Sequence, residues 1–245
     1  MKVKKILMSR EGDTFYVNDD MKDYHMEFGV VKKEELQGNV ATSNAKHKTL
    51  FVVDADFMDN YKRMKRTAQI MIPKDLGIIL AETGIGPDSV IIEAGSGSGA
   101  AGCFLARYVK HVYSYDVKKE HYDTAKENAE MLGVKNITLY NQDVLEGAKE
   151  KGADLFLLDV PEPWTILDVV SSSLKKGGYL VCYNPTILQI ADNVNTVEKR
   201  DDFIYLKSVE VIEREWHVRG KSVRPDMHGL SHTGFLSFFR KVSPQ

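Results

Sequence analysis

Cysteine is scarce in this chain of 245 residues, which contains two, and no hydrophobic run approaches the length of a membrane span. Cys103 and Cys182 stand among apolar neighbours, so we expect buried thiols in a reducing, cytoplasmic setting rather than a disulfide framework or a metal site. The first residues lack the apolar core of a signal peptide. An excess of one charge is also lacking, because 33 Lys and Arg stand against 35 Asp and Glu. A nucleic-acid partner would therefore have to be held by local basic clusters.

Residues 90–99, Val-Ile-Ile-Glu-Ala-Gly-Ser-Gly-Ser-Gly, predict a buried strand that runs into a tight turn, with a helix over 100–107. Alternating glycines let a ligand approach the backbone, and the start of the helix adds free N–H groups. Alone, this pattern also fits a plain turn. Asp116 strengthens it, because it ends the next predicted strand about 20 residues after the glycines, where a carboxylate meets the ribose hydroxyls of a nucleoside.

Two ligands fit this turn, a dinucleotide and S-adenosylmethionine. The residue three after Gly97 is Ala100, so a phosphate-binding fingerprint is met only in its Gly/Ala form. The carboxylate of Glu93, just before the turn, would repel a pyrophosphate but suits the cationic sulfonium and amino group of S-adenosylmethionine. The other interpretation of Glu93 is a solvated acid at a strand end. We favour S-adenosylmethionine.

Beyond residue 66 the chain alternates predicted strands and helices, which is typical of a doubly wound parallel sheet. The expected strands are 90–94, 111–116, 137–140, 155–158 and 179–183, and the expected helices are 76–83, 100–107, 118–132, 164–174 and 186–199, with a turn at Gly177-Gly178. Two last strands, 209–218 and 234–242, follow without a helix between them. This antiparallel ending separates seven-stranded methyltransferases from dinucleotide dehydrogenases. We therefore predict an α/β fold over 66–245, a seven-stranded Rossmann-like class I methyltransferase sheet with an antiparallel last strand.

Residues 1–65 differ from the rest and predict a small β-domain, a barrel or a sandwich, with a linking helix. Short alternating runs such as 3–8, 14–17 and 50–53 are separated by turn-forming residues. The spacing over 54–66 indicates a helix that ends in the cation-rich segment 62–66. Those cations fit the negative end of a helix dipole, and they equally fit contacts with phosphates. The sequence leaves these two interpretations open.

Acidic side chains lie at or just beyond the ends of the first four strands of the predicted sheet: Glu93, Asp116, Asp143 and Asp159. Ligands of open α/β sheets bind at this edge. We expect Asp116 to take the ribose hydroxyls and Asp143 the exocyclic amine of an adenine. The alternative role for Asp143 is to cap a helix.

The segment Asp159-Val160-Pro161-Glu162-Pro163-Trp164 predicts a rigid loop where an acceptor must enter. Trp164 offers a broad apolar face, and a prolyl ring packs flat against a base. The pattern is similar in logic to the Asp/Asn-Pro-Pro-aromatic loop of nitrogen methyltransferases that act on bases. A purely structural loop is the alternative.

Three motifs taken together are specific: Gln-Ile-x-x-Pro-Lys-Asp at 69–75, Asp-x-Pro-x-Pro-Trp at 159–164 and His-Thr-Gly-Phe at 232–235. With segments 23–30, 64–68, 93–100, 183–186 and 224–225, they make the chain resemble the tRNA (adenine-N1) methyltransferases of the TrmI type over nearly its whole length. The resemblance implies methyl transfer from S-adenosylmethionine to N1 of adenosine 58 in the tRNA T-loop, with 57 also modified by some archaeal members. It also implies a homotetramer. From the chemistry and the composition we expect no metal and no membrane partner.

Carried onto this chain, the resemblance makes Asp159 the catalytic carboxylate. The implied cofactor-binding residues are Glu93, Gly95, Ser96, Gly97, Ser98, Gly99, Ala100, Asp116 and Asp143, with His121 and Gln69 as further candidates. The implied substrate-binding residues are Pro161, Pro163, Trp164, Ile72, Arg224 and His232, the last two in a connection over 219–232 that also carries Arg219, Lys221 and His228. A carboxylate bonded to the exocyclic amine would stabilise the cation that N1-methylation creates, or accept its proton. The base must be extruded from the folded tRNA to reach it.

Two departures from the family pattern concern the substrate side. The family usually places Tyr or His where this chain has Ile72, so a contact with the base there would be apolar. The early Asp-x-His-Thr pattern reads His25-Met26 here and loses a hydroxyl. Two other functions remain alternatives: a class I methyltransferase acting on another base or a small molecule, and a non-catalytic tRNA-binding subunit, which would have tolerated loss of the glycines and of Asp159.

Overall fold

The computed structural model describes residues 2–226 and 232–243, and it divides into two compact units. One consists of Met1–Met64 with Met131–Gly133, and the other of Lys65–Glu130 with Val134–Gln245. Within the described ranges, no helix combines the length and the apolar character that crossing a membrane requires.

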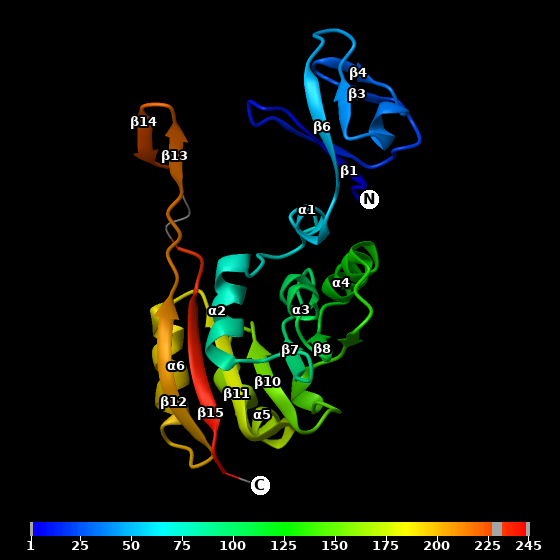
Figure 1. Ribbon diagram of the computed structural model, residues 1–245. Helices are drawn as coiled ribbons and strands as arrows, with labels where there is room; N and C mark the ends of the chain where they lie inside the picture. The colour runs from blue at the N-terminus through cyan, green and yellow to red at the C-terminus, as the bar shows by residue number, and fades with distance from the viewer. Residues whose placement is uncertain (1, 227–231, 244–245) are drawn as a thin grey trace. The chain divides into compact units, whose positions relative to one another are not determined.

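The N-terminal unit is built from short antiparallel strands in two small sheets (Figure 1). Its elements are β1 (Lys5–Met8), β2 (Thr14–Val17), β3 (Tyr24–Met26), β4 (Gly29–Val31), the 3-10 turn η1 (Glu35–Gln37), β5 (Val40–Thr42) and β6 (Thr49–Asp54). One sheet has the order β2-β1-β6-β5, and β3 pairs with β4. Leu7, Val17, Leu36 and Leu50 lie in its core. The predicted small β-domain is confirmed.

The linking helix is much shorter than predicted. Helix α1 spans Phe57–Tyr61 and begins at a capping box made by Asp56 and Asp59. Beyond it, the backbone N–H of Lys65 donates to Asn128 Oδ1 at 3.1 Å, a tertiary partner that a continuing helix would have replaced by an intrahelical carbonyl. Lys62 is the C-cap of this helix and the other cations of 62–66 follow it, so both interpretations of these cations stay predictions.

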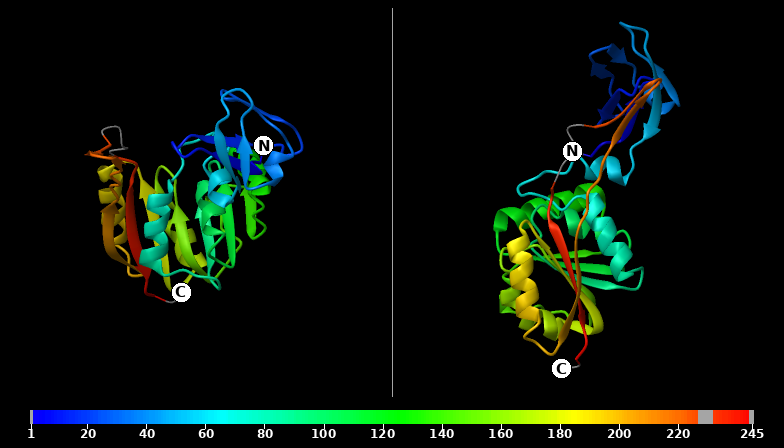
Figure 2. Two further views of the ribbon diagram at one scale, coloured as in Figure 1. Left: turned by 45° about the horizontal axis from the view of Figure 1, so that its top comes forward. Right: turned by 90° about the vertical axis from the view of Figure 1, so that its left-hand side faces the viewer.

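The second unit is a seven-stranded sheet with helices on its two faces (Figures 1 and 2). Its strands are β7 (Val90–Ala94), β8 (His111–Asp116), β9 (Ile137–Asn141), β10 (Ala153–Leu158), β11 (Leu174–Asn184), β12 (Phe203–Glu210) and β15 (Phe235–Lys241). Its helices and 3-10 turns are α2 (Pro73–Thr83), α3 (Ala100–Leu105), α4 (Lys119–Leu132), η2 (Val144–Glu146), η3 (Pro163–Ile166), α5 (Leu167–Ser173) and α6 (Ile187–Val197). The right-hand view of Figure 2 shows α2 and α6 on opposite faces.

The strand order β12-β15-β11-β10-β7-β8-β9 confirms the predicted fold class. The strands β11, β10, β7, β8 and β9 are parallel, whereas β15 is antiparallel to its two neighbours. Along the chain, strands are added outward from β7 to β9 and then on the other side of β7 by β10. The order reverses between β7 and β10, which is where an open α/β sheet binds its ligand.

The sheet is held by fully buried apolar side chains on successive strands. Ile92, Phe156, Leu180 and Phe239 are each 0% exposed and pack in one cluster. Burying a side chain of this size stabilises a fold by about 1.5–3 kcal/mol relative to leaving it in water. The central strands are therefore a rigid base for the loops at their ends.

Two sequence predictions in this unit are wrong. Gly177-Gly178 lies inside β11 rather than in a turn, because the pairing of β11 with β10 shifts register and Gly177 takes a φ of +79°. The strand predicted over 209–218 is two elements: β12 ends at Glu210, and a separate hairpin joins β13 (Trp216–Arg219) to β14 (Ser222–Pro225). The charged run Glu213, Arg214 and Glu215 interrupts the alternation of apolar and polar residues at this break, so the sequence did carry a signal for it.

Candidate active site

A cavity of about 270 Å³ lies at the carboxyl ends of β7, β8, β9 and β10. Its volume is close to the lower end of the range of about 300–1,000 Å³ typical of small-molecule sites. The predicted site residues that line it are Gly95, Asp116, His121, Asp143, Asp159 and Pro161. Residues from four strand ends thus meet in one place, as the sequence predicted.

The glycine-rich turn needs glycine at residue 95 for two independent reasons. Gly95 has a φ of +93°, and a Cβ there would overlap the carbonyl oxygen of Asp159. The backbone N–H groups of Gly95 and Ser96 both donate to the carbonyl of Tyr115, at 2.9 and 3.2 Å. The turn therefore brings the end of β7 against the segments that follow β8 and β10.

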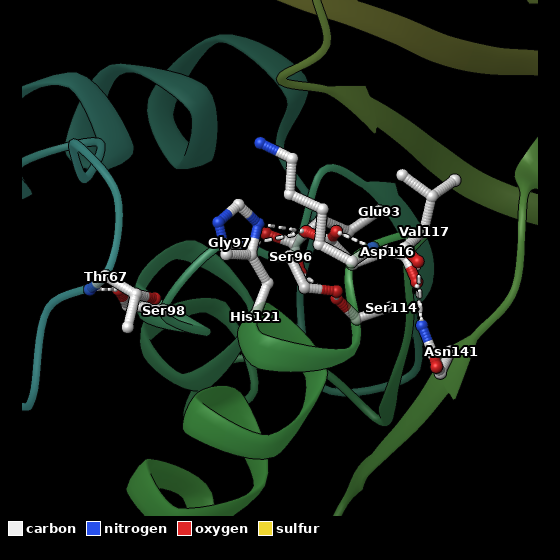
Figure 3. A network of polar contacts seen from close by, with 11 residues as sticks. Thr67, Glu93, Ser96, Gly97, Ser98, Ser114, Asp116, Val117, His121 and Asn141 are labelled. Atoms are coloured by element: carbon white, nitrogen blue, oxygen red, sulfur yellow. Dashed lines mark hydrogen bonds and ion pairs between the residues drawn. The ribbon is translucent and has the colours of Figure 1, made fainter.

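Asp116 is the hub of the polar network in Figure 3. Its carboxylate accepts hydrogen bonds from the backbone N–H of Gly97 at 2.9 Å and of Lys118 at 2.9 Å, and it contacts His121 Nδ1 at 3.1 Å. The side chain is 7% exposed but borders the cavity. Asp116 thus fixes the glycine turn as well as facing the ligand site.

Glu93 is buried, not solvated, so its interpretation as a surface acid is wrong. It is 1% exposed and accepts a hydrogen bond of 2.5 Å from Ser114 Oγ, which also contacts Ser96 Oγ at 2.6 Å. Burial raises the pKa of Glu93 to about 8, although the bond from Ser114 opposes this rise. At pH 7 the side chain is therefore mostly protonated, and a bound cation would favour its ionisation.

A second, small cavity of about 20 Å³ lies on the other side of the glycine turn. The predicted residues that line it are Gln69, Glu93, Gly95, Ser96, Gly97, Ser98, Ala100 and Asp159. Ser98 has another task, because its Oγ accepts from the N–H of Thr67 at 3.0 Å and its carbonyl accepts from Asn128 Nδ2 at 2.8 Å. Gly95 and Asp159 border both cavities.

Asp159 follows β10 directly, and its N–H donates to the carbonyl of Ala94 at 2.9 Å. Burial raises the pKa of its carboxyl to about 7, and the charge of Asp116 adds to the rise. The loop behind it is held by Gln189, whose Nε2 donates to the carbonyl of Pro161 at 3.0 Å. A carboxyl with a pKa near 7, at the junction of two cavities, is suited to proton transfer or to stabilising a developing cation.

Asp143 fits both of its sequence interpretations. It caps the 3-10 turn η2 by accepting from the N–H of Leu145 at 2.9 Å, and it lines the larger cavity. The sequence missed several other lining residues, namely Tyr115, Val117, Lys118, Gln142 and Val144. All five lie within two residues of Asp116 or Asp143, so proximity to a strand-end acid in the sequence was a signal that could have found them.

Six predicted residues do not border either cavity: Gly99, Ile72, Pro163, Trp164, Arg224 and His232. Ile72 is the N-cap of α2, and Pro163 is buried at the start of η3. Arg224 lies on β14, and His232 contacts Glu210 and the carbonyl of Pro185. Within the described ranges, no group of acids, histidines and cysteines could hold a metal ion. His228 lies outside the described residues.

Comparison with known proteins gives relatives along almost the full length. The tRNA (adenine(57)-N(1)/adenine(58)-N(1))-methyltransferase TrmI of Methanocaldococcus jannaschii is 29% identical, over 98% of this chain and 95% of the relative. The tRNA (adenine(58)-N(1))-methyltransferase TrmI of Thermus thermophilus is 33% identical, over 73% of this chain and 71% of the relative.

A solved structure, described as that of an S-adenosylmethionine-dependent O-methyltransferase from Thermotoga maritima, superposes with a TM-score of 0.88. It is 27% identical and covers 99% of this chain and 94% of that one. The family model described as tRNA methyltransferase complex GCD14 subunit matches residues 61–234, most of the chain and all of the cavity-lining residues. The resemblance stated from the motifs is confirmed: the chain belongs to the GCD14/TrmI family of tRNA methyltransferases.

Proposed function

We propose that this chain transfers a methyl group from S-adenosylmethionine to N1 of adenosine 58 in the tRNA T-loop. The observation that carries the proposal is Asp159, a partly buried carboxylate that borders both cavities at the switch point of the sheet. The TrmI enzymes of Methanocaldococcus jannaschii and Thermus thermophilus support it, since their names specify N1 of adenine 58. The archaeal name also includes 57, so this position is the second candidate.

The larger cavity fits S-adenosylmethionine, which supplies an activated methyl group on a sulfonium cation. Asp116 would accept from the ribose hydroxyls and Asp143 from the adenine amine, with His121 beside Asp116. Gly95 lets the turn pack against the backbone of Asp159, whose carbonyl oxygen any Cβ at residue 95 would overlap. Glu93, just behind the turn, would release its proton in the field of the bound cation and stabilise it. The remaining turn residues, from Ser96 to Ala100, shape the backbone of this site.

Asp159 acts on the acceptor. N1 of adenine is a modest nucleophile, and its methylation places positive charge on the exocyclic amine. A carboxylate bonded to that amine stabilises the charge as it develops and can accept a proton. Its raised pKa, about 7, makes it a stronger base than an ordinary aspartate at neutral pH.

The acceptor side is the exposed edge around Pro161. We propose that Pro161, Trp164 and Ile72 contact the extruded base and its neighbours. Pro163, buried at the start of η3, and His232, which contacts the carbonyl of Pro185, would support this edge. Arg224 is proposed to contact phosphates. The charge of one chain is nearly balanced, so a single subunit offers little basic surface to tRNA. We propose a cytoplasmic homotetramer that combines the basic segments 62–66 and 219–224 of several subunits into one surface for the tRNA phosphates.

The experiment is methylation of unmodified tRNA transcripts with labelled S-adenosylmethionine, followed by primer extension, which stops at N1-methyladenosine. Three transcripts are compared: one with adenosine at 57 and 58, one with guanosine at 58 and one with guanosine at 57. We expect label and a stop at 58, both lost with guanosine at 58.

A remaining stop at 57 would extend the specificity to that position. If the protein binds S-adenosylmethionine but labels no tRNA, the assignment of tRNA as the acceptor is wrong, and a small-molecule acceptor becomes the better hypothesis. Binding of tRNA without binding of S-adenosylmethionine would favour the non-catalytic subunit and contradict the proposal.

A further inference from the structure

Residues 211–233, which we name the arm, connect β12 to β15 along the chain. The arm carries the β13–β14 hairpin, and its described residues are 211–226, 232 and 233. The register pairs Phe235 with Glu210 on one side and with Asn184 on the other. The two ends of the arm therefore stand side by side at the same edge of the sheet as the carboxyl end of β11.

Lys74 holds both ends of the arm. Its Nζ donates to the carbonyl of Val211 at 2.6 Å, to Thr233 Oγ1 at 2.7 Å and to Asp75 Oδ1 at 2.7 Å. These acceptors use all three of its N–H donors. The side chain of Lys74 is 9% exposed, so water cannot readily replace its partners.

Asp75 completes this cluster. It is 1% exposed, and its Oδ2 accepts from Thr233 Oγ1 at 2.9 Å, so Thr233 is bonded to both members of the ion pair. A buried ion pair contributes little net stability after its desolvation cost, but it tolerates few alternative geometries. The cluster is therefore better explained as a device that fixes the position of the arm on α2 than as a source of stability.

A second contact ties the arm to β11. His232 Nδ1 lies 2.6 Å from Glu210 Oε1, and its Nε2 lies 2.9 Å from the carbonyl of Pro185, the residue after β11. Because both partners only accept hydrogen bonds, both ring nitrogens must donate, which requires the imidazolium form. The hydrogen bond to Glu210 raises the pKa of His232 in agreement with this form.

The segment just before Lys74 is a wall of the small cavity. Gln69, Ile70 and Met71 line it together with Asp159. Since Lys74 and Asp75 lie in the first turn of α2, the wall of the site and the two ends of the arm are joined through three or four residues of backbone. Displacement of the two ends of the arm would therefore be transmitted along this backbone to Gln69, Ile70 and Met71.

The hairpin has two chemically different faces, because directly paired residues share a face. Trp216 pairs with Pro225 and Val218 with Val223, which makes one face apolar. The other face carries three basic side chains, His217 and Arg224 in one pair and Arg219 in the next. Arg224 is exposed, as a contact with RNA phosphates would require.

We propose that Lys74 is a positioning residue for the acceptor: by fixing both ends of the arm, it holds the basic face of the hairpin at a set distance from Asp159, so that phosphate contacts orient the target base. This inference rests on the proposed tRNA substrate. It assigns Lys74 no contact with the cofactor or the reacting atoms.

The test is a double-mutant cycle between Lys74→Met and Arg224→Ala, read as KM and kcat for tRNA transcript at saturating S-adenosylmethionine. Alone, Arg224→Ala is expected to raise the KM for tRNA about tenfold through a lost phosphate contact. In the Lys74→Met background the same change should raise it less than about twofold, because a released hairpin no longer delivers Arg224. The affinity for S-adenosylmethionine should stay within about threefold throughout.

The matched control is Lys241→Met, which removes another buried lysine whose Nζ donates to the backbone carbonyls of Ser171 and Leu174. Lys241→Met should lower the melting temperature but leave unchanged the rise in KM for tRNA that Arg224→Ala causes. If Lys74→Met fails to fold, Thr233→Val removes the shared hydroxyl at nearly constant volume and takes its place in the cycle.

Hydrogen exchange of the amides of 212–226 tests the clamp without any acceptor: it should accelerate in Lys74→Met and not in Lys241→Met. Three outcomes would overturn the inference: unchanged amide exchange in Lys74→Met, additive effects of the two mutations on the KM for tRNA, or no effect of Arg224→Ala alone on this KM. In each case the proposed function stands as long as the wild type methylates tRNA. Absence of that methylation would overturn the proposed function itself.

Discussion

The backbone N–H of Gly97 donates a 2.9 Å hydrogen bond to Asp116 Oδ2, which joins the turn after β7 to the carboxyl end of β8. The spacing of these residues in the sequence predicted that both face one ligand. The structure adds that the acid also holds the turn in shape. Loss of the Asp116 carboxylate therefore affects the site in two ways.

We expect Asp116→Asn to weaken S-adenosylmethionine binding by about 10- to 100-fold, because the amide loses the charge-assisted bonds to the ribose and to the turn. Titration calorimetry with the purified protein measures this. Asp123→Ala, on the exposed side of α4, removes an acid of the same type and should change the affinity by less than about twofold. Equal effects of the two variants would show that the Asp116 carboxylate has no special role.

Gly95→Ala should destabilise the protein far more than Gly84→Ala. Both glycines have a positive φ, +93° and +62°, but a Cβ at Gly84 meets nothing within 4 Å, whereas one at Gly95 overlaps Asp159. We expect about 1–2 kcal/mol for Gly84→Ala from backbone strain and about 4 kcal/mol or more for Gly95→Ala. Urea denaturation measures the difference, and similar values for the two variants would contradict the observed approach of the turn to β10.

Stability should fall as the pH rises towards 8 in the absence of cofactor. The pKa of Glu93 is raised to about 8 in the folded protein from 4.5, so between these values the folded state binds more protons than the unfolded chain. The free energy of unfolding then decreases with pH, by at most about 1.4 kcal/mol per pH unit for this group. Asp159 acts in the same direction up to a pKa of about 7, so Glu93 dominates above it.

Glu93→Gln should remove the decrease above pH 7, because a glutamine binds no proton in either state. Denaturation midpoints at about pH 7 and about pH 8 in the variant and the wild type provide the measurement. A wild-type curve that is flat in this range, or a variant curve with the same slope, would mean that the pKa of Glu93 is not raised.

The methylation rate should depend on the ionisation of Asp159. Its carboxylate is the active form, so protonation at low pH slows the reaction. The positive charge of the bound sulfonium opposes the rise in the pKa of Asp159. We therefore expect the single-turnover rate to fall at low pH, as the acid limb of its pH profile, with a midpoint between the ordinary aspartate pKa of 3.8 and about 7. Asp159→Asn should show no limb in this range. A limb retained in that variant would assign the titration to another group.

The elements around the site were predictable because they rely on local signals. Alternating glycines, buried aliphatic runs and strand-end acids located β7, β8 and the cavity to within a residue or two. The start of α2 was predicted three residues too late, at 76: the helix begins at Pro73, since proline at the first helical position loses no intrahelical bond.

Tertiary contacts decided what the sequence could not show. The helix after β6 ends early, and the backbone N–H of Lys65 then bonds Asn128, 63 residues away. The cluster of Lys74, Asp75 and Thr233 joins residues 158 or more apart, and no spacing rule relates them. The break between β12 and β13, by contrast, had a local signal, the charged run 213–215, which the prediction of one strand over 209–218 missed.

Single-turnover methylation of a tRNA transcript by the wild type and by Asp159→Asn, at saturating S-adenosylmethionine, tests whether the Asp159 carboxylate takes part in the reaction. We expect both proteins to bind the cofactor and the transcript, and the variant to methylate N1 of adenosine 58 at least about 100-fold more slowly. A variant that methylates that adenosine at the wild-type rate would contradict this expectation, because the carboxylate at the junction of the two cavities would then take no part in the reaction.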